Sequence, residues 1–314
     1  MSFTSEVKQE IAMNELHPCC VKAQLSALVQ MLCSINFSKD GMDLRIKCEH
    51  APTAKRIFRF MKDRYQAEMQ FSVMKKMKLK KNFVYILRIY SKVNEILEDL
   101  EILTDAGLQA HISKESISSE CCARAYLAGA FLASGSVNAP KTSNYHLEIS
   151  TSEEVQASFI LELMNQFYLG AKMIKRRNQY VVYLKASDHI GDFLRLVGTS
   201  EALFAFEDAR IQRDLMNSIK RLDNCELANE MKSVAAGMKQ LEDIHWIDNY
   251  FGIENLPEKL KHAAQARIAL PEGSLMELCD YCEHAYREKI SKSGMKHRLA
   301  KLKEMANQMR QNQE

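Results

Sequence analysis

The sequence feature that most constrains the fold of this chain is a repeat within its first two hundred residues. The segment CCVKAQL at 19–25 aligns with CCARAYL at 121–127, and the register still holds where SIN at 34–36 aligns with SVN at 136–138. A unit of roughly one hundred residues is too long for a solenoid repeat. The repeat therefore predicts two similar halves related by a pseudo-twofold axis, and it disfavours two unrelated α+β domains.

Each half contains the same order of local patterns: helix, strand or strand pair, helix, hairpin, helix. Alternating apolar and polar residues predict half-buried strands, and apolar residues every three or four positions predict helices. The matched elements are strands at 43–47 and 146–150, helices at 54–61 and 155–162, and hairpins around Asn82 and Asn178. We therefore expect two matching layers of helix and sheet.

The helix expected at 121–133 is rich in small residues and contains Gly129, with Ala27 at the matching place in the first repeat. A glycine inside a helix costs about 1 kcal/mol relative to alanine. Close packing against another helix is the usual compensation. We therefore expect the two repeat helices to cross at the centre of the domain.

The composition is that of a globular protein. Hydrophobic residues make up 46% of the chain and charged residues 26%, which excludes a disordered chain, a collagen-like fibre and a disulfide scaffold. A length of 314 residues favours at least two domains. No apolar run approaches the roughly 18 residues of a membrane span, and the N-terminus lacks an export signal. The nine cysteines, an odd number in apolar stretches, indicate reduced thiols in the cytoplasm.

Positive charge is concentrated in two blocks, 55–92 and 287–310, although the formal net charge is only +3. Two such blocks favour two surfaces that meet one polyanion, although solvated faces of ordinary elements would give the same pattern. Cations on a sheet face suit phosphate contacts, whereas lysines on an edge strand also protect against aggregation. The candidate phosphate contacts in the two hairpins are Lys76, Lys78, Lys80, Lys175, Arg176 and Arg177.

The last third of the sequence has helical patterns. Residues 201–223 form a charged helical connector, and a new domain follows from 224 to 310. A helix is expected over 227–247. A second helix, with Pro257 near its first turn, is expected to break at 271–273, where proline and glycine occur. Ser274 and Ser291 are suited to cap a third and a fourth helix.

The fourth helix has one apolar stripe and one polar face flanked by cations. The stripe consists of Met295, Leu299, Leu302 and Ala306. The opposite face can enter a major groove, with small or polar residues toward base edges and cations toward phosphates. An amphipathic surface helix with solvated lysines is the alternative. The candidate DNA-binding residues are Ser291, Lys292, Ser293, Lys296, His297, Arg298, Lys301 and Lys303.

The segment LAGAFLASG at 127–135 resembles the LAGLIDADG signature of homing endonucleases, and 25–33 is a weaker copy. The resemblance implies a pseudo-symmetric saddle that lies on DNA, with a carboxylate at the end of each signature helix to bind a catalytic metal. The matching positions here are Leu32 and Ser134. Because hard divalent cations need oxygen ligands, chiefly carboxylates, we predict that the scaffold persists without strand cleavage.

The whole chain resembles the WhiA family, sporulation and cell-division transcription regulators of Gram-positive bacteria. The most specific matches are the segments 2–8, 221–229 and 290–299 and the two Cys-Cys helices. The resemblance implies an α+β fold in which a duplicated LAGLIDADG-like saddle precedes an all-α helix-turn-helix domain. The expected parts are halves at 1–110 and 111–200, a linker at 201–223 and the helix-turn-helix domain at 224–310, with the motif itself from Ser274 to Gln308. One departure is the segment 279–289, which is longer than the usual turn of the family.

The leading hypothesis is a non-enzymatic transcription regulator that binds double-stranded DNA, associates with the nucleoid in the cytoplasm and acts in division, chromosome segregation and, where it occurs, sporulation. Alternatives are a division-associated protein-interaction scaffold with weak DNA binding and an active homing-type endonuclease. Other transcription or division proteins are further possible partners; no membrane partner and no cofactor are predicted.

No metal site is predicted from the sequence. Cys279 and Cys282, with His284 and His297 nearby, lack the second ligand pair of a structural zinc site. The Cys-Cys pairs of the repeat could be redox pairs, but buried small hydrophobes are the favoured interpretation.

Overall fold

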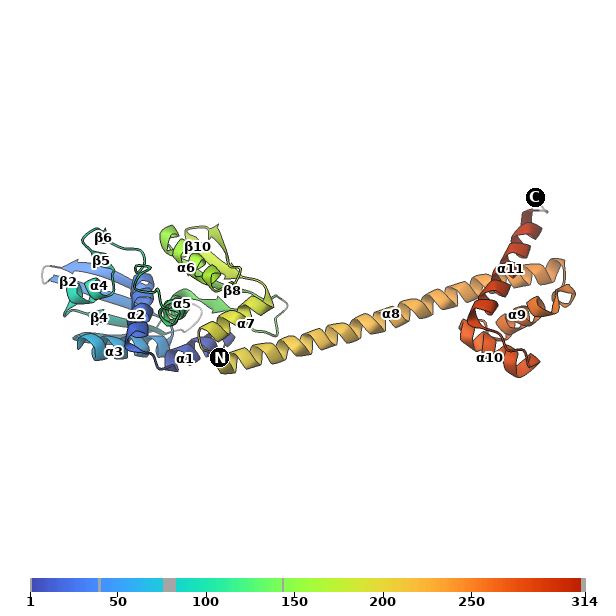
Figure 1. Ribbon diagram of the computed structural model, residues 1–314, viewed down its shortest axis with the longest axis horizontal. Helices are drawn as coiled ribbons and strands as arrows, with labels where there is room; N and C mark the ends of the chain where they lie inside the picture. The colour runs from blue at the N-terminus through green and yellow to red at the C-terminus, as the bar shows by residue number, and fades with distance from the viewer. Residues whose placement is uncertain (1, 39–40, 76–82, 143, 312–314) are drawn as a thin grey trace. The chain divides into compact units, whose positions relative to one another are not determined.

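The computed structural model describes residues 2–38, 41–75, 83–142 and 144–311 (Figure 1). The chain divides into two compact units, Met1–Arg213 and Asp214–Glu314. Helix α8, Ser200–Tyr250, begins in the first unit and continues into the second. None of the helices in the described ranges is long and apolar enough to cross a membrane.

The first unit contains two halves that, after the additional helix α1, share the order helix, two strands, helix, two strands, helix. The first half has α1 Phe3–Met13, α2 Pro18–Leu32, β1 Cys33–Ser38, β2 Gly41–Cys48, α3 Ala51–Tyr65, β3 Met69–Lys75, β4 Phe83–Ile89 and α4 Val93–Asp99. A small ribbon follows, β5 Leu103–Thr104 and β6 Gly107–Leu108. The second half has α5 Glu120–Ser134, β7 Ser136–Val137, β8 Leu147–Thr151, α6 Glu154–Gln166, β9 Lys172–Arg176, β10 Gln179–Leu184 and α7 Ser187–Leu196.

The two sheets have equivalent topologies, which confirms the duplication predicted from the sequence. The strand orders are β1-β2-β4-β3 and β7-β8-β10-β9, and every neighbouring pair is antiparallel. In each second strand the alternation buries one face, with Leu44 and Ile46 in β2 and Leu147 and Ile149 in β8. The buried faces of both sheets belong to one continuous core.

Helices α2 and α5 cross at the centre of this unit, as the small residues predicted. A Cβ atom added to Gly129 would lie 2.6 Å from the main-chain oxygen of Gln24 and 3.0 Å from the Cβ of Ala27. A side chain larger than hydrogen would therefore push the two helix backbones apart. The hairpin turn expected around Asn178 is confirmed between β9 and β10, whereas Asn82 lies outside the described residues.

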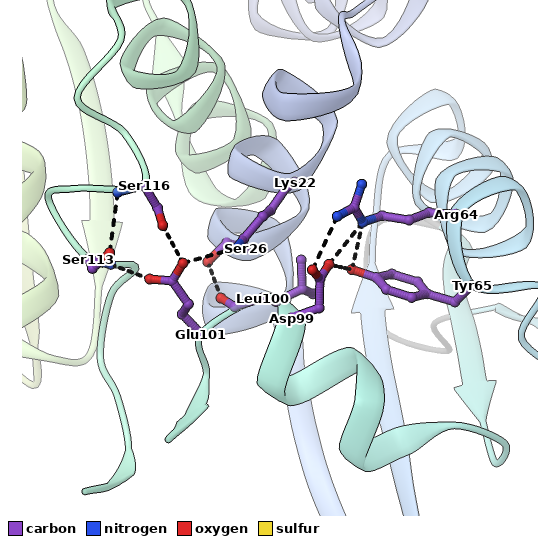
Figure 2. Close-up of polar contacts among 9 residues, drawn as sticks. All are labelled: Lys22, Ser26, Arg64, Tyr65, Asp99, Leu100, Glu101, Ser113 and Ser116. Carbon is purple, nitrogen blue, oxygen red and sulfur yellow. Dashed lines mark hydrogen bonds and ion pairs between the residues drawn. The ribbon is translucent and has the colours of Figure 1, made fainter. Parts of the chain in front are cut away.

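A polar network fastens the connection between the halves to α2 (Figure 2). Glu101 accepts hydrogen bonds from the Lys22 Nζ at 2.9 Å, the Ser113 backbone N–H at 2.9 Å and the Ser116 hydroxyl. Partial burial acts to raise the pKa of Glu101, but the hydrogen bonds from the two serines and Lys22 outweigh it and lower the pKa to about 2. Ser26 donates to the Leu100 carbonyl at 2.9 Å. The segment that leaves the first half is thus held against the central helix.

Figure 2 also shows a second carboxylate anchor, Asp99, which lies two residues earlier at the end of α4. Asp99 accepts hydrogen bonds from the Arg64 Nε at 2.9 Å and from the Tyr65 hydroxyl at 2.6 Å. Both donors lie at the C-terminal end of α3. This contact fixes α4 to the neighbouring helix just before the chain crosses to the second half.

The second unit is entirely helical in its described residues. After α8 it contains the 3₁₀ turn η1 Ile253–Asn255, α9 Glu258–Ala269, α10 Leu275–Tyr286 and α11 Lys292–Gln311. Both predicted caps are confirmed. The Ser274 hydroxyl accepts from the Glu277 N–H at 3.3 Å within a capping box, and the Ser291 hydroxyl accepts from the Gly294 N–H at 3.1 Å.

The structure extends one sequence expectation about this region and corrects another. The connector at 201–223 and the helix at 227–247 are parts of the single helix α8, because no proline or glycine before Gly237 interrupts the helical pattern. The segment 279–289 is not a long turn. Residues 279–286 complete α10, which ends at Arg287 in a left-handed conformation with φ of 55°, and only 287–291 connect α10 to α11.

Candidate nucleic-acid interface

The packing of α11 determines which of its residues can meet a ligand. Met295, Leu299, Leu302 and Ala306 are all buried in the core of the second unit, which confirms the predicted stripe. Helices α9 and α10 contribute Leu260, Ala263 and Leu278 to the same core. Because this stripe is fixed, the opposite face of α11 is turned to solvent.

The exposed face of α11 carries most of the residues predicted from the sequence. The exposed members are Ser291, Lys292, Ser293, Lys296, His297, Lys301 and Lys303. Ser293 and Ala300 lie toward the centre of this face, with lysines beside them. Glu304 is exposed on the same face, one turn beyond Ala300, so the purely cationic part is confined to the N-terminal three turns.

Arg298, which was also predicted to contact DNA, makes contacts within the second unit. Its Nη2 lies 2.6 Å from Glu288 Oε1 and its Nη1 donates to the Lys259 carbonyl at 3.2 Å. The other oxygen of Glu288 lies 2.8 Å from the His262 Nδ1. The hydrogen bond from Arg298 lowers the pKa of Glu288 to about 2 despite partial burial of the carboxylate. The Arg298 guanidinium thus ties α11 to α9 and to the α10–α11 connection, because its position borders the buried stripe.

A second cationic surface lies on the solvent face of the first sheet, at residues that the sequence analysis did not select. Arg45 and Lys47 of β2 are exposed because they alternate with buried Leu44 and Ile46. The strand alternation predicted at 43–47 already implied that Arg45 and Lys47 face solvent, although only hairpin residues were selected as candidate phosphate contacts. Lys76, Lys78 and Lys80 lie outside the described residues.

An acid on the same sheet face reduces the charge available there. Arg88 of β4 is opposite Arg45 in the strand register, but its Nη2 lies 2.8 Å from Asp43 Oδ2. The hydrogen bonds from Arg88 and Asn36 lower the pKa of Asp43. The positive charge of Arg88 is therefore partly neutralised by Asp43 within the sheet.

The structure separates the three cations predicted in the second hairpin. Lys175 lies on the face that also carries Tyr180, with its Nζ 5.0 Å from the centre of that ring. Arg176 lies on the opposite face, where its Nη1 is 3.8 Å from Glu148 Oε2. Arg177 occupies the turn with a φ of 55°. Strand alternation places neighbouring residues on opposite faces, so the three side chains do not form one surface.

The C-terminal ends of α2 and α5 meet beside a cavity of about 350 Å³. At the two signature positions, Leu32 packs against the core, and the Ser134 hydroxyl donates to the Ser150 carbonyl at 2.5 Å. Ser134 thereby joins the end of α5 to β8. Glu153 is the single acidic side chain among the described residues that line this cavity.

Three family models match the chain in succession. The WhiA N-terminal LAGLIDADG-like domain matches residues 18–103, the WhiA LAGLIDADG-like domain matches 123–216, and the WhiA C-terminal HTH domain matches 219–306. The fold is thus that of a duplicated LAGLIDADG-like unit joined to a helix-turn-helix unit.

Similarity to whole proteins gives the family directly. The probable cell division protein WhiA of Bacillus pumilus (strain SAFR-032) is 44% identical over 314 residues, which covers 100% of this chain and 98% of the relative. The protein of the same description from Bacillus subtilis (strain 168) has the same identity and coverage. The chain belongs to the WhiA family. A crystal structure of full-length WhiA from Thermotoga maritima shares the fold, with a TM-score of 0.60 and 22% identity over 98% of this chain and 99% of that one.

Proposed function

We propose that the protein binds double-stranded DNA through the exposed face of α11 and regulates transcription during cell division. The carrying observation is that the buried stripe of Met295, Leu299 and Leu302 fixes the helix so that Lys292 and Lys296 face solvent. An α-helix fits the major groove, where small or polar side chains can approach base edges while lysines contact phosphates. The matched HTH model and the relatives named as probable cell division proteins support this proposal.

The proposed contact set is Ser291, Lys292, Ser293, Lys296, His297, Lys301 and Lys303. Arg298 is left out because its guanidinium is occupied by Glu288 and the Lys259 carbonyl. In the first unit, exposed Arg45 and Lys47 are added to the auxiliary phosphate contacts proposed in the two hairpins, of which Arg176 is partly neutralised by Glu148. The domain boundary at 223/224 remains a prediction.

The test is DNA binding by a Lys292→Ala/Lys296→Ala variant, measured by fluorescence anisotropy on genomic duplexes over a series of salt concentrations. Loss of two phosphate contacts should weaken binding about tenfold and reduce the slope of log K against log salt by about 2. Lys239→Ala is the matched control, because Lys239 is an exposed lysine on α8 of the same unit. Equal affinities for the wild type and the α11 variant would refute the assignment.

We also propose that the protein does not cut DNA, because Leu32 and Ser134 occupy the positions at which the signature helices of homing endonucleases carry carboxylates. Incubation of supercoiled plasmid with the purified protein and Mg²⁺ should leave the plasmid intact. Magnesium-dependent nicking that disappears in a Glu153→Gln variant would support the nuclease hypothesis instead.

The proposed role extends to chromosome segregation and, in organisms that form spores, to sporulation, with the protein associated with the nucleoid in the cytoplasm. The competing hypothesis is a division-associated scaffold that contacts other proteins and barely uses DNA. Chromatin pull-down with sequencing separates the two. A regulator should give discrete enriched sites that are lost in the Lys292→Ala/Lys296→Ala variant, whereas a scaffold would give none.

A further inference from the structure

Four thiols from two distant segments meet where helices α2 and α5 begin. The Sγ atoms of Cys19, Cys20, Cys121 and Cys122 all lie within 4.8 Å of one another. In the parts of the chain that the structure describes, they are the one group of three or more His, Cys, Asp or Glu side chains close enough to share an ion. The sequence favoured burial of these cysteines as small hydrophobic residues, but only Cys20 and Cys122 are buried.

The pseudo-symmetry of the first unit creates this cluster. Each Cys-Cys pair occupies the second and third positions of its helix, and the two helices cross closely at Gly129. The opposite ends of the same helices carry Leu32 and Ser134 beside the cavity. The thiol cluster therefore lies at the far end of the helix pair from the positions that bind metal in homing endonucleases.

The residues that precede the two helices contact the sulfur atoms in equivalent ways. His17 is the N-cap residue of α2, and its Nδ1 lies 3.0 Å from the Sγ of Cys19. Ser119 is the N-cap residue of α5, and its hydroxyl lies 3.5 Å from the Sγ of Cys121. Neither side chain makes the usual hydrogen bond to the helix backbone. Both polar groups are instead directed at the exposed sulfur of their own pair.

We propose that these four cysteines form a structural site for a single Zn²⁺ ion that fastens the two halves together. Zinc binds four thiolates tetrahedrally at about 2.3 Å, which requires sulfur separations of roughly 3.8 Å. The sulfurs of Cys19 and Cys20 are already 3.9 Å apart, and the others need only a small contraction. An iron–sulfur cluster, in which the cysteines bind different iron atoms, would require a wider arrangement.

The local electrostatics suit such a site. Binding converts four thiols into thiolates, releases their protons to solvent and leaves a net charge of −2 on the complex. The N-terminal ends of two helices carry partial positive charge and stabilise thiolates. The exposed Cys19 and Cys121 provide an entry path for the ion, while buried Cys20 and Cys122 close the inner side. Each half contributes two ligands, so neither half alone could form the site.

The experiment uses the reduced, metal-free full-length protein and Co²⁺ as a spectroscopic substitute for Zn²⁺. We expect one equivalent of Co²⁺ to bind with the visible absorption of tetrahedral thiolate coordination, and Zn²⁺ to displace it. A Cys19→Ser/Cys121→Ser variant changes only exposed sulfurs. Its affinity for Co²⁺ should fall by about 100-fold or more. Cys225→Ser, at an exposed cysteine of α8, is the matched control and should bind as the wild type does.

A second measurement needs no variant. Zn²⁺ should protect the four cluster cysteines of the wild type from alkylation, read residue by residue by mass spectrometry, and should raise the melting temperature of the first unit. Equal Co²⁺ affinity of the wild type and the double variant would overturn the proposal. So would alkylation of the four thiols at the same rate with and without Zn²⁺. Isolation of the protein with an iron–sulfur chromophore, or with disulfides in the cluster whose reduction does not permit Zn²⁺ binding, would overturn it as well.

Discussion

The two units present positive charge to solvent in different ways. On α11 the core takes one side of the helix, and the N-terminal three turns of the other side carry exposed lysines with no acid among them. On the two sheets the cations share their face with acids, through the Arg88–Asp43 pair in the first and the Arg176–Glu148 pair in the second. A similar supply of basic residues therefore gives a continuous cationic surface in one unit and a partly neutralised one in the other.

This difference follows from how each element arranges its neighbours. On a helix, residues three and four apart share a face, so a run of lysines at that spacing stays together. On a sheet, each residue has cross-strand neighbours from other parts of the sequence, and an acid there can pair with the cation. We infer that the helical unit makes the main contact with DNA and that the duplicated unit acts chiefly as a scaffold with weaker contacts.

The largest expected effect comes from Gly129→Ala. The added Cβ would lie 2.6 Å from the Gln24 main-chain oxygen, so one of the central helices must shift. We expect the free energy of unfolding of the first unit to fall by about 1–3 kcal/mol. Thermal unfolding followed by circular dichroism measures this change, and the transition of the second unit serves as the internal control. If the first unit is mainly a scaffold, DNA affinity below its melting temperature should stay unchanged; a large loss of affinity would break the comparison.

The next effect concerns the ion pair that orients α11. Glu288→Gln should lower the free energy of unfolding of the second unit by about 1–2 kcal/mol at neutral pH, because the Arg298 guanidinium loses its carboxylate partner. The folded pKa of Glu288 is about 2, below the unfolded value of about 4.3. Its contribution is therefore complete above about pH 5 and is lost as the pH falls toward 2.

Melting temperatures of the second unit between pH 7 and pH 3 test this prediction. The difference between wild type and Glu288→Gln should shrink as the pH falls, since the wild-type carboxylate becomes protonated in the unfolded state first. A difference that stays constant over this range would show that the ion pair does not stabilise the unit.

The smallest effect should come from the sheet surface. Arg45→Ala/Lys47→Ala removes two exposed cations from the first sheet, at positions whose side chains point away from the core. We expect DNA binding to weaken by no more than about threefold and the salt slope to fall by less than it does for the Lys292→Ala/Lys296→Ala variant. Anisotropy titrations of the two double variants side by side compare the loss of DNA affinity caused by each. A larger loss from the sheet variant would reverse the assignment of the main interface.

Much of the fold was predictable because its signals are local or repeated. The matching of residues 19–25 with 121–127 predicted the duplication, and the spacing from Met295 to Ala306 predicted the buried stripe of α11. Gly129 predicted the helix crossing, since only a close approach explains a glycine there. The length of α8 was not predicted, because two adjoining helical segments look the same in sequence whether or not they join into one helix.

The candidate site was predictable only in part. The exposed lysines of α11 followed from its periodicity, but Arg298 borders the stripe, and no sequence pattern shows that Glu288 and the Lys259 carbonyl occupy its guanidinium. Strand alternation could have separated Lys175 from Arg176 and could have selected Arg45 and Lys47. The three cations of the second hairpin were chosen because they correspond in position to the lysines of the first hairpin, and that correspondence does not report the direction of each side chain.

The sequence by itself determined the order of the elements, the duplication and the apolar face of each helix, because these depend on which residues are near neighbours along the chain. Only the tertiary structure decided which distant groups meet. Cys19 and Cys121 are separated by about one hundred residues and come together because two pseudo-symmetric helices start side by side. Contacts of this kind depend on the packing of whole elements, and local periodicity carries no information about them.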